Sequence, residues 1–136
     1  RAGNHVSRYI EIAEEYYSEG DNKAAGVHLR SAFEFILKRY CKKNNLRVRY
    51  EIDLSRHTTD DFWLAIKDFK TSEDARIAGT AQRTRCNLLP QTINDVEVCR
   101  RFVLNPLCHQ DITKHESSSE IQKAIDVINT LKSELR

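Results

Sequence analysis

The sequence has few of the residues on which a β-sheet protein or a membrane protein depends. Its 136 residues include four Gly and two Pro, whereas a sandwich or barrel needs turn residues about every 8–12 positions. No apolar run approaches the roughly 18 residues of a membrane-spanning helix, and no signal peptide opens the chain. These absences favour a single helical domain, and we expect no membrane partner.

An excess of one charge sign is also missing. The chain has 22 Lys and Arg against 20 Asp and Glu, a formal net charge of +2, which argues against a disordered acidic or polybasic tail. Methionine is absent and the first residue is Arg. We therefore expect residues 1–136 to form one helical domain that is a piece of a longer polypeptide, and the resemblance given below implies its C-terminal part.

The four cysteines contain no C-x-x-C pair and no zinc-finger spacing. Cys41, Cys99 and Cys108 lie beside or within apolar helical stretches, so we expect buried free thiols. A metal site of Cys108, His109 and His115 is the alternative interpretation. We expect no metal and no cofactor, and free thiols favour a reducing, cytoplasmic location.

Apolar residues recur at helical spacing along most of the chain. They predict a first helix that ends before Gly20, with Asp21 or Asn22 capping the second. The second is expected over residues 22–43 and the others over about 59–69, 72–87, 92–105 and 120–135. The predicted fold class is all-α, a five- to six-helix bundle.

Two expectations concern the core. Trp63, the single tryptophan, is expected to anchor it. The helix over 92–105 is expected to turn one apolar set inward: Ile93, Val96, Cys99, Phe102 and Val103.

Chemistry-bearing residues gather on one face of the second predicted helix. Arg30 and Glu34 are four residues apart and therefore neighbours, with Gly26 one turn before them and Lys38 one turn after. Glycine inside a helix costs about 1 kcal/mol relative to alanine. Here it would leave a notch beside the guanidinium, wide enough for a backbone or a phosphate. The alternative is a surface ion pair worth about 0.3–0.5 kcal/mol.

A second polar cluster lies in the segment RRFVLNPLCH. Glu97, Arg101 and Asn105 follow i, i+4 spacing, and His109 joins that row if the chain stays helical past Pro106. The helix dipole favours a protonated histidine near a helix C-terminus, which suits a general acid. A surface histidine, with Asn105 as a helix stop, is the alternative.

Positive charge is concentrated between positions 38 and 56, against only Glu51 and Asp53. This excess indicates either a solvated helix end or a rim that contacts phosphates. The basic residues of this stretch are Lys38, Arg39, Lys42, Lys43, Arg47, Arg49 and Arg56.

The combination of LRSAFEFILKRYC with the distant RRFVLNPLCH resembles the C-terminal helical domains attached to ATPases of bacterial defence systems. The characterised relatives are the bacterial anticodon nucleases, of the HEPN superfamily. In those nucleases an Arg-x-x-x-Glu pair on one helix and a distant His form the active site. The resemblance therefore assigns catalysis to Arg30, Glu34 and His109. The superfamily favours four to six residues between Arg and His, whereas seven separate Arg101 from His109.

The resemblance implies a HEPN-like bundle that cleaves RNA, plausibly tRNA, without a metal. It further implies that the domain forms a homodimer and is the effector of an antiphage defence system. An ATPase in the same polypeptide would restrain its activity. Cleavage by the ribose 2′-hydroxyl needs a base, an acid and a cation on the phosphate. His109 and Glu34 would exchange protons while Arg30 holds the phosphate. Supporting RNA contacts are expected from Lys38, Lys42, Lys43, Arg101 and Asn105.

Two alternatives remain open. The first is a catalytically inactive HEPN-like module that dimerises or binds nucleic acid for a defence ATPase. The second is an unrelated helical domain that binds proteins.

Overall fold

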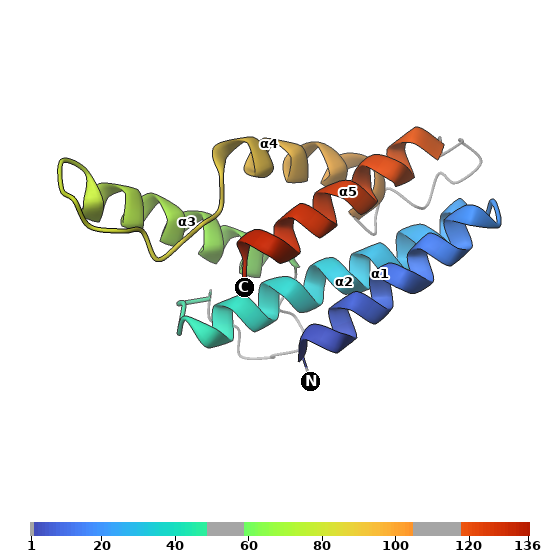
Figure 1. Cartoon of the computed structure of the whole chain (residues 1–136), viewed down its shortest axis with the longest axis horizontal. Helices are drawn as coiled ribbons and strands as arrows, with labels where there is room; N and C mark the ends of the chain where they lie inside the picture. Colours follow the sequence, from blue (N-terminus) through green and yellow to red (C-terminus); the bar gives the residue numbers. More distant parts are fainter. Residues whose placement is uncertain (1, 49–58, 105–117) are drawn as a thin grey trace.

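The computed structural model describes residues 2–48, 59–104 and 118–136. These ranges contain no β-strand and hold five α-helices and one π-helix. In chain order they are α1 (Ala2–Ser18), α2 (Asn22–Lys43), α3 (Thr59–Ile77), α4 (Pro90–Cys99), the π-helix η2 (Arg100–Leu104) and α5 (Ser118–Glu134). The prediction of an all-α bundle is confirmed (Figure 1).

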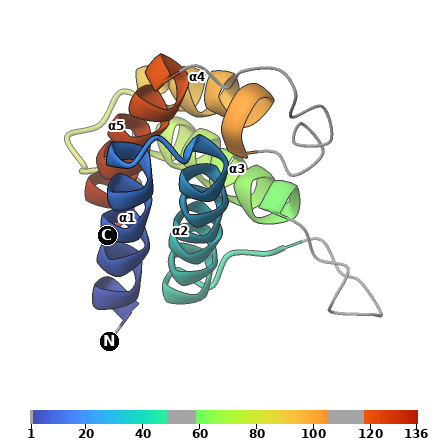
Figure 2. The ribbon, with the colours of Figure 1, turned by 90° about the vertical axis from the view of Figure 1, so that its right-hand side faces the viewer.

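The first two helices form an antiparallel hairpin, which Figures 1 and 2 show side by side. Gly20 has φ +83°, a left-handed conformation that glycine adopts without strain. The Asp21 carboxylate then accepts a hydrogen bond from the Ala24 N–H at 3.0 Å, which satisfies a free donor in the first turn of α2. The predicted end of α1, the cap and the span 22–43 of α2 are all confirmed.

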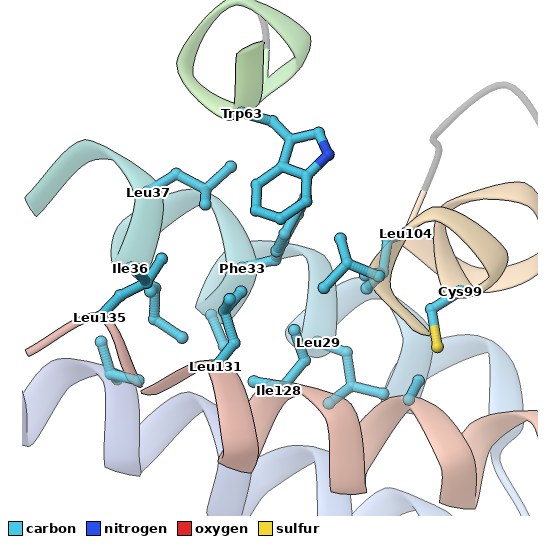
Figure 3. Packing of buried hydrophobic residues seen from close by; sticks show 14 of the residues in the cluster. Leu29, Phe33, Ile36, Leu37, Trp63, Cys99, Leu104, Ile128, Leu131 and Leu135 are labelled. Carbon is cyan, nitrogen blue, oxygen red and sulfur yellow. The ribbon is translucent and has the colours of Figure 1, made fainter. Parts of the chain in front are cut away.

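The core is built around α2, which packs against α1, α3, η2 and α5. Figure 3 shows apolar side chains of α2 meeting those of α5 on one side and Trp63 of α3 on the other. Trp63 is 1% exposed, so its predicted role as an anchor is confirmed. The α2 side chains in this contact are Leu29, Phe33, Ile36 and Leu37, and those of α5 are Ile128 and Leu131, with Leu135 just after the helix end.

The prediction of a separate helix over 72–87 is wrong. α3 continues through Ile77, and the chain then turns at Gly79, whose φ is +72°. The Ile77 carbonyl accepts hydrogen bonds there from the backbone N–H and the hydroxyl of Thr80, at 3.0 and 2.8 Å. Residues 80–89 are not helical. Of the alanines at helical spacing in this stretch, Ala75 lies near the end of α3, whereas Ala78 and Ala81 come after it.

The helix predicted over 92–105 is present but changes type before its end. α4 begins with Pro90 at its first position, where the missing N–H removes no helical hydrogen bond. From Arg100 to Leu104 the chain is π-helical, with i→i+5 hydrogen bonds that shift the register of its side chains. Val103 is buried, as predicted, and Leu104 is buried too, whereas Phe102 is 49% exposed. The prediction that Phe102 faces inward is therefore wrong.

Among the described helices, none is both long and apolar enough to cross a membrane.

Candidate functional site

The row predicted on α2 lies along one edge of that helix. Gly26 is buried, and Arg30 is half-buried with its Nη1 atom out of contact with solvent. Glu34 is 48% exposed at its side chain, and its Oε2 lies 2.7 Å from Nζ of Lys38. The geometry thus brings Glu34 and Lys38 into an ion pair, with the Arg30 guanidinium one turn earlier.

Lys38 also reaches the neighbouring helix. Its Nζ lies 5.7 Å from the centre of the Phe62 ring in α3, which is within the range of a cation–π contact. Cys41 lies about one turn after Lys38 on α2, and its thiol donates to the Phe62 carbonyl at 3.7 Å. The α2 row therefore adjoins the start of α3.

The second predicted cluster is divided by the π-helix. Arg101 is exposed. Glu97 instead joins α4 to α3, because its Oε2 accepts from Nζ of Lys67 at 2.8 Å and from the Trp63 indole N–H at 3.3 Å. Its other oxygen accepts from Arg100 at 3.2 Å, and Arg100 also pairs with Asp60. Burial lowers the pKa of Arg100 from its ordinary value.

The remaining predicted residues of that cluster, Asn105 and His109, lie outside the described residues, as does the alternative metal set of Cys108, His109 and His115. Within the part of the chain that is described, no three His, Cys, Asp or Glu side chains are grouped so that they could hold a metal ion.

The basic end of α2 is exposed. Lys42 and Lys43 occupy its last turn, where cations complement the helix dipole. Asn44 closes the helix, and its side-chain amide donates to the Tyr40 carbonyl at 3.0 Å. Arg47 is exposed a few residues later, while Arg49 and Arg56 lie outside the described residues.

A cluster around Glu73 was missed by the sequence reasoning. Glu73 is 2% exposed, and Arg76 binds both of its oxygens at 3.0 Å. Arg85 adds its backbone N–H at 2.8 Å and its guanidinium at 2.8 and 3.2 Å. These hydrogen bonds, those of Arg76 first, hold the pKa of the Glu73 carboxyl well below its usual range. The cluster fixes the 78–89 segment to α3, because Arg85 of that segment binds Glu73 of α3. Donors of the chain itself thus occupy both carboxylate oxygens of Glu73.

Tyr40 extends this cluster toward α2, since its hydroxyl donates to the Arg85 carbonyl at 3.4 Å. Burial, with smaller effects of Cys86 and Glu73, raises the pKa of Tyr40 far above its ordinary value. The local sequence TSEDARI gives no signal of a buried carboxylate, because Glu73 looks like one of several surface charges.

The described cysteines are buried free thiols, as predicted for Cys41 and Cys99, and Cys86 joins them. Burial raises the pKa of Cys41 to about 11 and that of Cys99 to about 11. These two side chains are therefore protonated at neutral pH and serve as core residues rather than nucleophiles. Cys108 lies outside the described residues.

Comparison of the chain with protein-family models, with curated proteins and with solved structures gives no match.

Proposed function

We propose that the chain is the effector domain of a bacterial antiphage defence system, a metal-independent endoribonuclease similar to the anticodon nucleases and acting on tRNA. Arg30, Glu34 and His109 are its catalytic residues in this proposal. The active form is a cytoplasmic homodimer, restrained by an ATPase region of the same parent polypeptide. The family assignment rests on the segments LRSAFEFILKRYC and RRFVLNPLCH.

The observation that carries the proposal is the arrangement of the α2 row. Arg30 is half-buried with Nη1 enclosed, so the surrounding body restricts where its guanidinium can lie. One turn on, Glu34 exposes 48% of its side chain, with its Oε2 held by Lys38 at 2.7 Å. A confined cation beside an accessible carboxylate suits phosphate binding combined with proton transfer.

The proposed third residue follows an element that packs against α2. η2 packs against α2, and Figure 3 shows Leu104 in the same cluster as Leu29 and Phe33. His109 follows Leu104 by five residues. An extended chain covers at most about 3.6 Å per residue, so the Cα atoms of Leu104 and His109 are within about 18 Å of each other. The proposal places the His109 imidazole against Arg30 and Glu34, within that limit.

The proposed reaction proceeds by transfer of two protons. Glu34 takes the proton of the ribose 2′-hydroxyl, whose oxygen attacks the adjacent phosphorus. The bond from phosphorus to the 5′-oxygen breaks, and protonated His109 gives its proton to that oxygen. The products are a 2′,3′-cyclic phosphate and a 5′-hydroxyl, and Glu34 returns its proton to His109 to restore the site. Arg30 neutralises the phosphate oxygens throughout.

Further side chains support RNA in this scheme. Lys38 and Arg101 add positive charge near the phosphate, and Asn105 orients the imidazole or the RNA. Lys42 and Lys43 contact the backbone beyond the scissile bond. Because these contacts are to phosphate, they carry affinity rather than sequence preference.

Incubation of the purified chain with total tRNA in EDTA tests the proposal. Wild type is compared with Glu34→Ala and His109→Ala, and with Glu14→Ala as a matched control, since Glu14 is an exposed carboxylate of α1. We expect wild type and the control to give fragments that end in 2′,3′-cyclic phosphate. Each catalytic variant should lose at least about 100-fold in rate, the lower limit for removing a general acid or base.

Two results would contradict the proposal. Fragments formed equally by all four proteins would assign cleavage to a contaminant or to another site. If a folded wild type binds tRNA but yields no fragments, the result would support the alternative of an inactive nucleic-acid-binding module.

A further inference from the structure

A pocket lies between α3 and the segment that follows α2. Its volume is about 310 Å³, and it is lined by Arg47, Val48, Asp61, Leu64, Ala65 and Asp68. The α3 residues share one face, because positions 61, 64, 65 and 68 are spaced i, i+3, i+4 and i+7. Small-molecule sites begin at about 300 Å³, so this pocket suits one group the size of a nucleotide.

The lining combines an apolar surface with both signs of charge. Ala65 is 7% exposed and Leu64 is 53% exposed, so a large aliphatic side chain is left uncovered beside a buried alanine. Asp61 and Asp68 provide carboxylate acceptors whose helix positions are about 10.5 Å apart along the axis. Arg47 provides an exposed guanidinium. A planar ring would cover the apolar surface, donors on its edge would bind a carboxylate, and an attached phosphate would pair with the guanidinium.

The pocket adjoins the α2 row. Lys38 pairs with Glu34 at 2.7 Å and lies 5.7 Å from the Phe62 ring. Phe62 is the neighbour in sequence of Asp61, which lines the pocket. The start of α3, which lines the pocket, is therefore in contact with the α2 row.

We propose that this pocket binds one unpaired guanine base of the RNA, near the scissile bond. The inference rests on the proposed function for the nature of the ligand. Guanine presents two adjacent N–H donors on its Watson–Crick edge, and the Asp68 carboxylate accepts both. Uracil presents one donor between two carbonyl oxygens, which a carboxylate repels. The base lies on Leu64 and Val48, and its phosphate pairs with Arg47.

A lysine-bearing peptide is the competing ligand, because two carboxylates also attract a cation. Arg47 offsets one of the two carboxylates, which weakens the attraction of the pocket for a cation. The apolar surface of Leu64 and Val48 also matches the face of a base more closely than an ammonium group.

Binding of uncleavable RNA tests the inference. Fluorescein-labelled 2′-O-methyl tetranucleotides lack the attacking hydroxyl, and one containing a single guanine is compared with the all-uridine sequence by anisotropy. We expect wild type to bind the guanine-containing probe about tenfold more tightly, since a hydrogen bond to a charged group has that effect. Asp68→Asn should reduce this preference to less than about threefold, because its amide replaces one acceptor by a donor.

Further variants keep the test independent of folding. Leu64→Ala removes a half-exposed side chain and should weaken both probes, with the fold checked by circular dichroism. Asp74→Asn is the matched control, because Asp74 is an exposed carboxylate of α3 that pairs with Lys70 outside the pocket. It should leave the preference unchanged.

Equal affinity of wild type for the two probes, or an unaltered preference in Asp68→Asn, would overturn the inference. Displacement of the guanine probe by trilysine amide at a lower concentration than by guanosine monophosphate would also overturn it, in favour of a cationic peptide. Failure of the proposed function is distinguishable. If the chain cleaves no tRNA but keeps the Asp68-dependent preference, the proposed function fails and the base site stands. If it cleaves tRNA but shows no preference for the guanine probe, only the base site fails.

Discussion

Glu73 is a buried carboxylate that two arginines hold in its charged form. Arg76 is a near neighbour in the sequence, but Arg85 is twelve residues away. The contact therefore depends on the path of the chain after Gly79 and could not be predicted from local spacing. At the same scale, the Asp21 cap and Gly20 could be predicted, because each acts within three or four residues of its own position.

The lowered pKa of Glu73 makes stability depend on pH. A carboxyl whose pKa is lower in the folded than in the unfolded chain stabilises the fold above its unfolded pKa, and this contribution is lost as pH falls toward the folded value. The ordinary pKa of Glu73 is 4.5, so the loss begins near that pH and continues below it. We expect the Tm of Glu73→Gln to be several degrees below that of wild type at pH 7. At pH 3 the difference in Tm between the two proteins should be smaller.

Thermal unfolding followed by circular dichroism at both pH values checks this prediction. Glu14→Gln serves as the control for removal of an exposed carboxylate and should follow wild type at each pH. A gap between Glu73→Gln and wild type that stays constant from pH 7 to pH 3 would contradict the linkage.

The helices differ in how much of them the sequence predicts. The span of α2 follows from signals at its two ends, and the Arg30–Glu34–Lys38 row follows from i, i+4 spacing within it. The π-helix at Arg100–Leu104 has no comparable signal in the sequence. Its register depends on how its side chains pack against α2 and α5, which lie far from it along the chain or follow it. Spacing alone placed Glu97 in one row with Arg101 and Asn105, whereas Glu97 binds Lys67 and Trp63 of α3.

Two substitutions in η2 test its register. Phe102 is 49% exposed and Leu104 is 3% exposed. We expect Phe102→Ala to change the free energy of unfolding by less than about 0.5 kcal/mol. Leu104→Ala should reduce it by about 2–5 kcal/mol, through lost contacts and a cavity.

Urea unfolding monitored by circular dichroism gives both values. The ranking is the informative result, because an uninterrupted α-helix with the predicted inward set would make Phe102 the more costly position. A larger loss for Phe102→Ala than for Leu104→Ala would therefore refute the π-helical register.

At the scale of the whole molecule, the positive charge at the end of α2 has two interpretations with different measurable effects. If Lys42 and Lys43 only complement the helix dipole, replacing them affects stability by about 0.3–1 kcal/mol each. If they contact RNA phosphates, each replacement also lowers the slope of log K against log salt by about one.

The paired variant Lys42→Gln, Lys43→Gln separates these effects. We expect it to bind tRNA more weakly, with a salt slope reduced by about two. Anisotropy titrations of labelled tRNA between 50 and 200 mM salt, a range over which phosphate contacts change affinity by about 10³-fold or more, supply the slopes. A variant with the wild-type slope and a small loss of stability would restrict these lysines to the helix end.

The all-α bundle follows from composition and periodicity over the whole chain, whereas the proposed active site requires two segments about 75 positions apart to meet. Arg30 and Glu34 are described on α2, and their juxtaposition with His109 is the central claim. The distance from the Arg30 guanidinium carbon to the nearer His109 ring nitrogen in a crystal of the chain tests it most directly. The account predicts a separation within about 6 Å, in one protomer or across a two-fold interface. A ring on the opposite side of the molecule, with no symmetry mate bringing another to Arg30, would contradict it.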